Sequence, residues 1–119
     1  MPTRTVGRIQ TRAAFAQLQR SRARATSGPV RATFVPASAT DTGVYPQVGY
    51  AIGTRCGNAV VRNTLRRRAR ESARAISGTL TPGRYLLRLE PAAARCEYAD
   101  LSAHVQRALQ AAAHPGPSS

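Results

Sequence analysis

Acidic residues are scarce in this chain of 119 residues, where five Asp and Glu residues stand against 18 basic residues. All 18 are arginine, because the sequence contains no lysine. The formal net charge is therefore +13 at pH 7. Charges of one sign repel one another in a small domain, so this imbalance predicts a polyanionic partner. The bias of a GC-rich genome explains arginine in place of lysine, but it does not explain the missing acids.

Long apolar runs are also missing. No stretch approaches the roughly 20 consecutive apolar residues that span a bilayer, and the N-terminus lacks the apolar core of a signal peptide. We therefore expect a cytoplasmic protein with no membrane partner. The two cysteines, Cys56 and Cys96, form no Cys-x-x-Cys motif and have no histidine at ligand spacing. The sequence thus supports neither a zinc site nor a disulfide framework.

Catalytic groups are few. The acids are Asp41, Glu71, Glu90, Glu97 and Asp100, and no two have the spacing of a metal-dependent nuclease site. Glu71 is interpreted as an ion-pair partner of Arg67 or Arg74, and His104 and His114 as surface residues. There is no Gly-rich phosphate loop of the P-loop type. The sequence favours a binding module over a self-sufficient enzyme, and we expect no catalytic residue and no metal ligand in the protein.

The chain length fits one domain with a small core. We expect a basic N-terminal arm over residues 1–10, a domain over residues 11–113 and a disordered Pro/Gly/Ser-rich tail over residues 114–119. Periodicity predicts helices over residues 11–21, 59–78 and 98–113, and strands over residues 30–35, 47–54 and 84–89. Asn58 is expected to cap the second helix, and residues 21–29 are interpreted as a basic turn region. Strands mixed with helices at this length predict one sheet with helices packed on it.

Residues 57–71 form the most informative segment, with five arginines and two asparagines. On a helical wheel at about 100° per residue, one arc carries Val61, Leu65, Ala69, Ser72 and Ile76. The opposite arc carries Asn63, Arg66, Arg67, Arg70 and Arg74. The first arc is expected to pack on a core, and the second to project a row of guanidinium groups outward. Guanidinium grips phosphate bidentately and stacks on bases, so the row predicts nucleic-acid binding rather than a merely solvated face.

The same segment resembles the motif of the bacterial ribonuclease P protein family, which is close to Lys-x-x-Gly-Asn-Ala-Val-x-Arg-Asn-Arg-x-Lys-Arg-x-x-Arg. Here residues 55–71 read RCGNAVVRNTLRRRARE. The resemblance extends over about residues 7–112 and is weaker outside the motif. Three positions depart from the family pattern: Thr64 stands where the motif has Arg, Gln19 replaces one of two aromatics on the first helix, and the aromatic expected near Thr33 is absent, with Phe34 beside it.

The resemblance implies an α+β fold, a two-layer α-β sandwich with a four-stranded sheet and helices. It also implies similarity to domain 2 of ribosomal protein S5, with a left-handed strand–helix–strand crossover, against the usual rule. The implied function is that of the protein subunit of ribonuclease P, an endoribonuclease whose catalytic RNA removes the 5′ leader of precursor tRNA to generate mature tRNA 5′ ends. The implied partners are the catalytic RNA and precursor tRNA. Mg²⁺ would be bound mainly by the RNA, with no small-molecule cofactor and no activity of the protein alone.

Two sets of candidate site residues follow, with the motif helix and its leading loop facing the RNA in the family. The RNA-binding candidates are Arg55, Asn58, Arg62, Asn63, Arg66, Arg67, Arg68, Arg70 and Arg74. The candidates for a cleft that binds the leader are Phe15, Gln19, Arg31 and Thr33. The alternatives are a structural ribosomal-type RNA-binding protein without a role in tRNA processing and a stand-alone nuclease.

Overall fold

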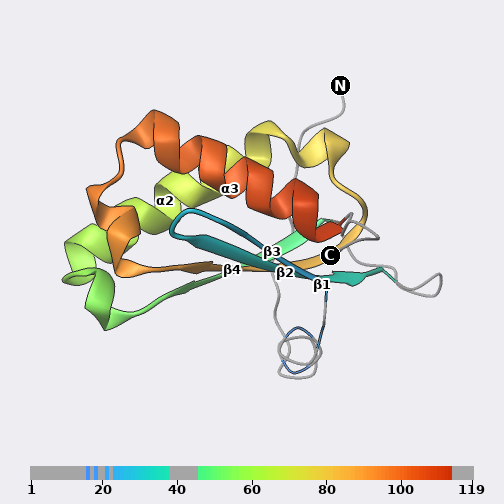
Figure 1. Ribbon diagram of the computed structural model, residues 1–119, viewed down its shortest axis with the longest axis horizontal. Coiled ribbons are helices and arrows are strands. Elements are labelled where there is room, and N and C mark those ends of the chain that lie inside the picture. The colour runs from blue at the N-terminus through green and yellow to red at the C-terminus, as the bar shows by residue number, and fades with distance from the viewer. Residues whose placement is uncertain (1–15, 17, 19–20, 22, 38–45, 114–119) are drawn as a thin grey trace.

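The computed structural model describes residues 16, 18, 21, 23–37 and 46–113. Four strands form one sheet in the order β1-β2-β4-β3, and two long helices cover one of its faces (Figure 1). The strands are β1 (Ala23–Ser27), β2 (Val30–Pro36), β3 (Gln47–Ile52) and β4 (Gly83–Leu89), and the helices are α2 (Ala59–Ala75) and α3 (Tyr98–Ala113). β3 runs parallel to β4, whereas the other two strand pairs are antiparallel. The predicted two-layer α+β architecture with a four-stranded sheet is confirmed.

Strand β1 shows that the prediction of a turn region over residues 21–29 was wrong. β1 pairs with β2 from Ala23 opposite Phe34 to Ser27 opposite Val30. Gly28 has a φ of 55°, and the ring of Pro29 fixes a negative φ at the next residue. Glycine at positive φ followed by a residue at negative φ is the pattern of a type II′ hairpin turn. The Gly-Pro pair therefore closes a hairpin, and the turn is much shorter than predicted.

The core lies between the sheet and the helices. Alternate residues of β2 and β4 point into it, among them Val30, Ala32, Phe34, Tyr85, Leu87 and Leu89. The rings of Phe34 and Tyr85 lie with their centroids 4.8 Å apart. Helix α3, predicted over residues 98–113, buries Leu101, Val105, Ala108, Leu109 and Ala112, which repeat with the helical period. His104 of the same helix, predicted to be a surface residue, is half-buried, and its Nδ1 forms a 2.8 Å hydrogen bond with Ser27 Oγ.

Helix α2 begins where the sequence predicts, because Asn58 Oδ1 accepts a hydrogen bond of 3.0 Å from the Val61 amide. Gly57, just before the cap, has a φ of 145°, and a Cβ there would lie 2.9 Å from the Val61 side chain. Only glycine fits this position without strain. The helix ends at Ala75, before the predicted end at residue 78, and a 3-10 turn (Ser77–Thr79) follows.

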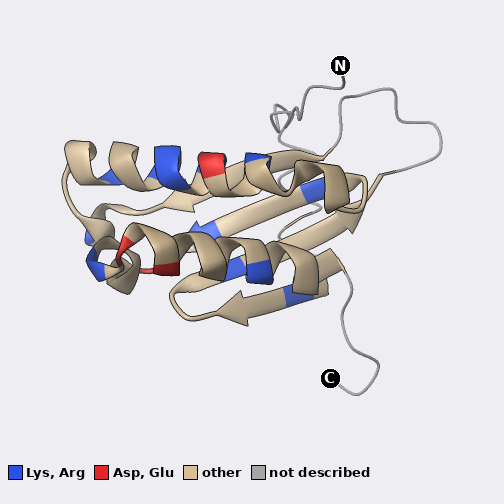
Figure 2. Ribbon diagram, turned by 90° about the horizontal axis from the view of Figure 1, so that it is seen from above, with Lys and Arg blue, Asp and Glu red and all other residues tan. Residues whose placement is uncertain are grey.

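The two helices lie side by side over different strands (Figure 2). α3 packs on β1 and β2, whereas α2 packs on β3 and against α3. Because β3 is an edge strand, the flank of α2 that faces away from α3 lies over the open edge of the sheet. No helix among the described residues is long and apolar enough to cross a membrane.

Some predictions are not tested by this fold. Ala16 and Leu18 are helical, but the rest of the first predicted helix, the arm over residues 1–10 and the tail over 114–119 lie outside the described residues, as does His114. The left-handed crossover and the similarity to ribosomal protein S5 stay predictions.

Candidate nucleic-acid interface

Helix α2 presents two basic flanks rather than one. At about 100° per residue, Arg68 lies some 120–160° around the helix from Arg62, Arg66, Arg70 and Arg74. The guanidinium of Arg68 stands over the ring of Tyr98 in α3, 5.7 Å from its centroid. Next to it, Gln106 Nε2 of α3 donates a hydrogen bond of 3.1 Å to the Ser72 carbonyl. Arg68 therefore faces α3. The other five arginines of α2, with Arg67 about 20° from Arg74, lie on the flank above the open edge of β3, which we call the open flank.

The open flank is a fixed row of cations. Arg62 Nε donates to the Gly57 carbonyl over 3.3 Å, and Arg66 Nη1 donates to Asn63 Oδ1 over 3.1 Å. Asn63, Arg67 and Arg74 are exposed, whereas Arg62, Arg66 and Arg70 are half-buried. No carboxylate of the described residues forms an ion pair with these side chains. Their charge is therefore available to an external polyanion.

Glu71 does not pair with Arg67 or Arg74, so the ion pair predicted from the sequence is wrong. Its Oε2 instead accepts a hydrogen bond of 3.1 Å from the Tyr98 hydroxyl of α3. This bond is the main cause of a raised pKa of Tyr98, with desolvation as a second cause. The helix places Glu71 on the side of α3, so the acid of the motif segment does not neutralise the open flank.

A groove on the opposite face of the sheet forms a second basic surface, with a volume of about 790 Å³. Arg31 and Thr33 of β2 line it, since they alternate with the core residues of that strand. Leu18, Ala51, Gly53 and Leu86 contribute small or apolar surface, and Arg24, Arg55 and Arg88 contribute charge. The groove therefore supplies positive charge along which a single-stranded backbone can run. Its described lining contains no aromatic side chain on which bases could stack.

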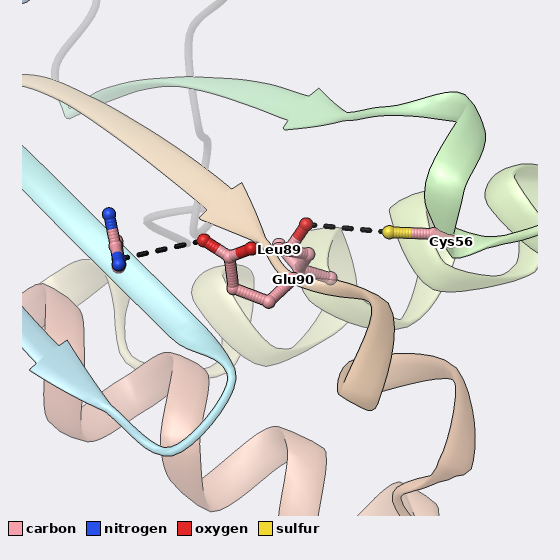
Figure 3. Close-up of polar contacts among 4 residues, drawn as sticks. Cys56, Leu89 and Glu90 are labelled. Carbon is pink, nitrogen blue, oxygen red and sulfur yellow. Dashed lines mark hydrogen bonds and ion pairs between the residues drawn. The ribbon is translucent and has the colours of Figure 1, made fainter.

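Two contacts at the end of β4 shape the groove (Figure 3). Cys56 Sγ donates to the Leu89 carbonyl over 3.4 Å and thereby ties the 3-10 helix Thr54–Cys56 to β4. Arg55 lies in this short helix, directly before the N-terminus of α2, so the groove and the open flank adjoin. Arg31 Nε forms an ion pair with Glu90 Oε1 over 3.5 Å. The Arg31 side chain is 63% exposed and the Glu90 side chain 38% exposed. Such an exposed pair stabilises the fold little and leaves Arg31 within reach of a ligand.

The structure brings together some of the residues predicted for the leader cleft and some of those predicted to bind RNA. Arg31 and Thr33 both line the groove, and Phe15 and Gln19 lie outside the described residues. Asn58 uses its side-chain oxygen to cap α2. Sequence reasoning missed Arg24 and Thr26 because their strand was taken for a turn. It also missed Arg88, although the alternation predicted for residues 84–89 already placed this side chain opposite the core residues.

The possible metal ligands are dispersed over the described part of the chain. There, no three His, Cys, Asp or Glu side chains gather closely enough to hold an ion. The side chains that line the two surfaces are mostly cationic or neutral, which suits phosphate rather than a metal ion.

A mixed four-stranded sheet under two helices, with an arginine flank and an arginine-lined groove, defines a small α+β protein of the RNA-binding class. Comparison with known families makes this more specific. The family model described as Ribonuclease P matches residues 4–113. The chain belongs to this family.

Relatives agree with the assignment, and a solved structure shows a similar fold. The chain is 36% identical over 107 residues to a ribonuclease P protein component from Synechococcus sp., covering 88% of this chain and 80% of that protein. It is 36% identical over 88 residues to the ribonuclease P protein component of Thermobifida fusca, covering 71% of this chain and only 60% of that protein. The fold is similar to that of the Staphylococcus aureus RNase P protein, with a TM-score of 0.77, 16% identity, and coverage of 91% and 96% of the two chains.

Proposed function

We propose that this chain is the protein subunit of ribonuclease P, which binds the catalytic RNA of that enzyme and the 5′ leader of precursor tRNA. The observation that carries the proposal is the pair of adjoining basic surfaces, the open flank of α2 and the sheet groove, joined through Arg55. Curated relatives are named ribonuclease P protein component. The protein subunit of an endoribonuclease with a catalytic RNA has two RNAs to contact at once, the catalytic RNA and the precursor tRNA. Two adjoining basic surfaces suit that task.

The shape of each surface suggests which RNA it binds. The open flank is a convex row of guanidinium groups on a rigid helix, and such a row suits the phosphate backbone of a folded RNA. We assign it to the catalytic RNA. The groove is concave, and its lining combines arginines with small residues such as Ala51 and Gly53. A single strand with unstacked bases fits such a surface, so we assign the groove to the leader.

The chemistry of cleavage is assigned to the RNA. The described carboxylates and histidines do not gather into a cluster, so we place the catalytic Mg²⁺ ions on RNA phosphates. The arginines reduce repulsion between the phosphates of the two RNAs, which Mg²⁺ would otherwise have to screen. The protein then acts as a non-catalytic subunit that lowers the magnesium requirement of the RNA.

A magnesium titration tests this function. Precursor tRNA is incubated with ribonuclease P RNA, with and without the full chain, and release of the leader is measured. We expect the protein to stimulate cleavage most where magnesium is scarce, and to cleave nothing without the RNA. Stimulation that is equal at all magnesium concentrations, or cleavage by the protein alone, would contradict the proposal. Binding of the RNA without any stimulation would favour a structural RNA-binding protein.

A further inference from the structure

The hydroxyl of Tyr50 is a buried polar atom that has no hydrogen-bond partner among the described residues. Tyr50 lies in β3 opposite Leu87, which is fully buried, so the ring points toward the helix layer. Its apolar part packs against the core. Phenylalanine would supply the same packing, and buried polar groups are nearly always hydrogen-bonded. The hydroxyl therefore contributes nothing visible to the fold, and another role has to account for it.

The helix that lies over β3 carries cations on its outer flank. α2 packs on β3 with its open flank above the edge of the sheet, and Arg70 and Arg74 both lie on that flank. Burial raises the pKa of Tyr50 to about 12, and the charges of Arg70 and, to a smaller extent, Arg74 oppose this rise. Both guanidinium groups thus act on the hydroxyl electrostatically. At neutral pH the hydroxyl keeps its proton and can donate it to an anionic oxygen.

We propose that Tyr50, Arg70 and Arg74 form a subsite for a backbone phosphate of RNA at the open edge of β3. The subsite rests on the proposed function, and it adds a residue outside the arginine helix to the RNA-binding surface. The side chain of Arg74 is exposed and that of Arg70 half-buried, and both are long enough to reorient around a phosphate. Because the hydroxyl is buried in the free protein, the arginine side chains must turn outward before a phosphate oxygen can reach it. The hydroxyl itself is fixed in place by the core packing of its ring.

Tyr50→Phe in the full chain tests the subsite, because it removes one oxygen atom and no charge. Affinity for ribonuclease P RNA is measured at several salt concentrations, together with the melting temperature. Loss of a hydrogen bond to a charged group should weaken binding by about tenfold. The slope of log affinity against log salt should stay the same, since no cation is removed. The melting temperature should not fall, because no bond within the protein is broken.

Arg74→Gln tests the other half of the subsite. This variant should weaken binding and reduce the salt slope by about 1, as expected when one cation no longer meets a phosphate. If both residues hold the same phosphate, the double variant should lose less affinity than the sum of the two single losses. Strictly additive losses would contradict a shared phosphate.

Tyr85→Phe is the matched control. The Tyr85 hydroxyl donates a hydrogen bond of 2.7 Å to the Thr81 carbonyl, so its removal should lower the melting temperature and leave RNA affinity unchanged. Wild-type affinity of Tyr50→Phe would overturn the subsite and would indicate that the hydroxyl takes no part in RNA binding. An equal loss of affinity in the two Phe variants would overturn it as well. If the unmodified chain does not prefer ribonuclease P RNA to an unrelated RNA of similar length, the proposed function itself fails.

Discussion

Gly28 illustrates how a single residue fixes the edge of the sheet. Its φ of 55° lies in the left-handed region that favours glycine. A Cβ at this position would lie 2.7 Å from the His104 ring. The same ring bonds Ser27, and Arg107 Nη1 donates to Ser27 Oγ over 3.3 Å. His104 and Arg107 therefore hold the turn against α3. The His104 ring also leaves no room for a residue larger than glycine at position 28.

Gly28→Ala should destabilise the protein by about 1–3 kcal/mol, as expected for a non-glycine residue at positive φ with an added steric clash. Gly78→Ala is the control, because a Cβ at Gly78 would meet no atom within 4 Å. Urea denaturation of the two variants measures both effects. His104→Ala should cost less stability in the Gly28→Ala background than in the wild type, because there it also removes the clash. Equal stability of the wild type and Gly28→Ala would contradict this account of the turn.

At the scale of the elements, α2 and α3 could be predicted from the sequence and the first strand could not. Leu65 and Ala69 in α2, and Leu101 and Val105 in α3, repeat with the helical period and are buried. β1 has the sequence ARATS, without a β-branched or aromatic run. Its pairing with β2, rather than its own propensity, makes it a strand. The groove was incompletely predicted for the same reason, since Arg24 and Thr26 belong to that strand.

The basic surface of α2 was predicted as one row, and its division into two flanks required the position of α3. A wheel gives the angles of the arginines around the helix axis, but it does not say which side a neighbouring helix covers. Arg68 and Tyr98 are far apart in the sequence, and they meet only because α3 folds back beside α2. The tertiary contact, rather than the helical period, therefore separates Arg68 from the open flank.

A variant in which Arg66, Arg67 and Arg70 are all replaced by Gln should bind ribonuclease P RNA more weakly. Its salt slope should fall by about 1 for each phosphate that these side chains neutralise in the wild type. The fold should survive, because Arg67 is exposed and the other two are only half-buried. Arg68→Gln is the control on the same helix, and it should change the salt slope less than Arg66→Gln does. Equal slopes for the triple variant and the wild type would show that the open flank does not contact the RNA.

At the scale of the whole molecule, the charge of +13 sets how stability responds to salt. The radius of gyration is 13.6 Å. The Debye length is about 30 Å at 0.01 M ionic strength and about 8 Å at 0.15 M. At the lower salt concentration most of the arginines therefore repel one another across the molecule, and at the higher concentration only close neighbours do. The described ion pair, Arg31 with Glu90, is exposed and offsets little of this repulsion.

The melting temperature of the free protein should therefore rise when NaCl is increased from about 0.01 M to about 0.15 M, by about 4–8 °C for each kcal/mol of repulsion removed. A protein held together by surface ion pairs would show the opposite trend, since salt weakens such pairs. Ribonuclease P RNA should raise the melting temperature at low salt by binding the folded state, and this gain should shrink as salt weakens binding. Sucrose serves as the uncharged control, because it stabilises folded proteins without screening charge. A melting temperature that falls or stays constant over this salt range would show that repulsion among the arginines does not limit stability.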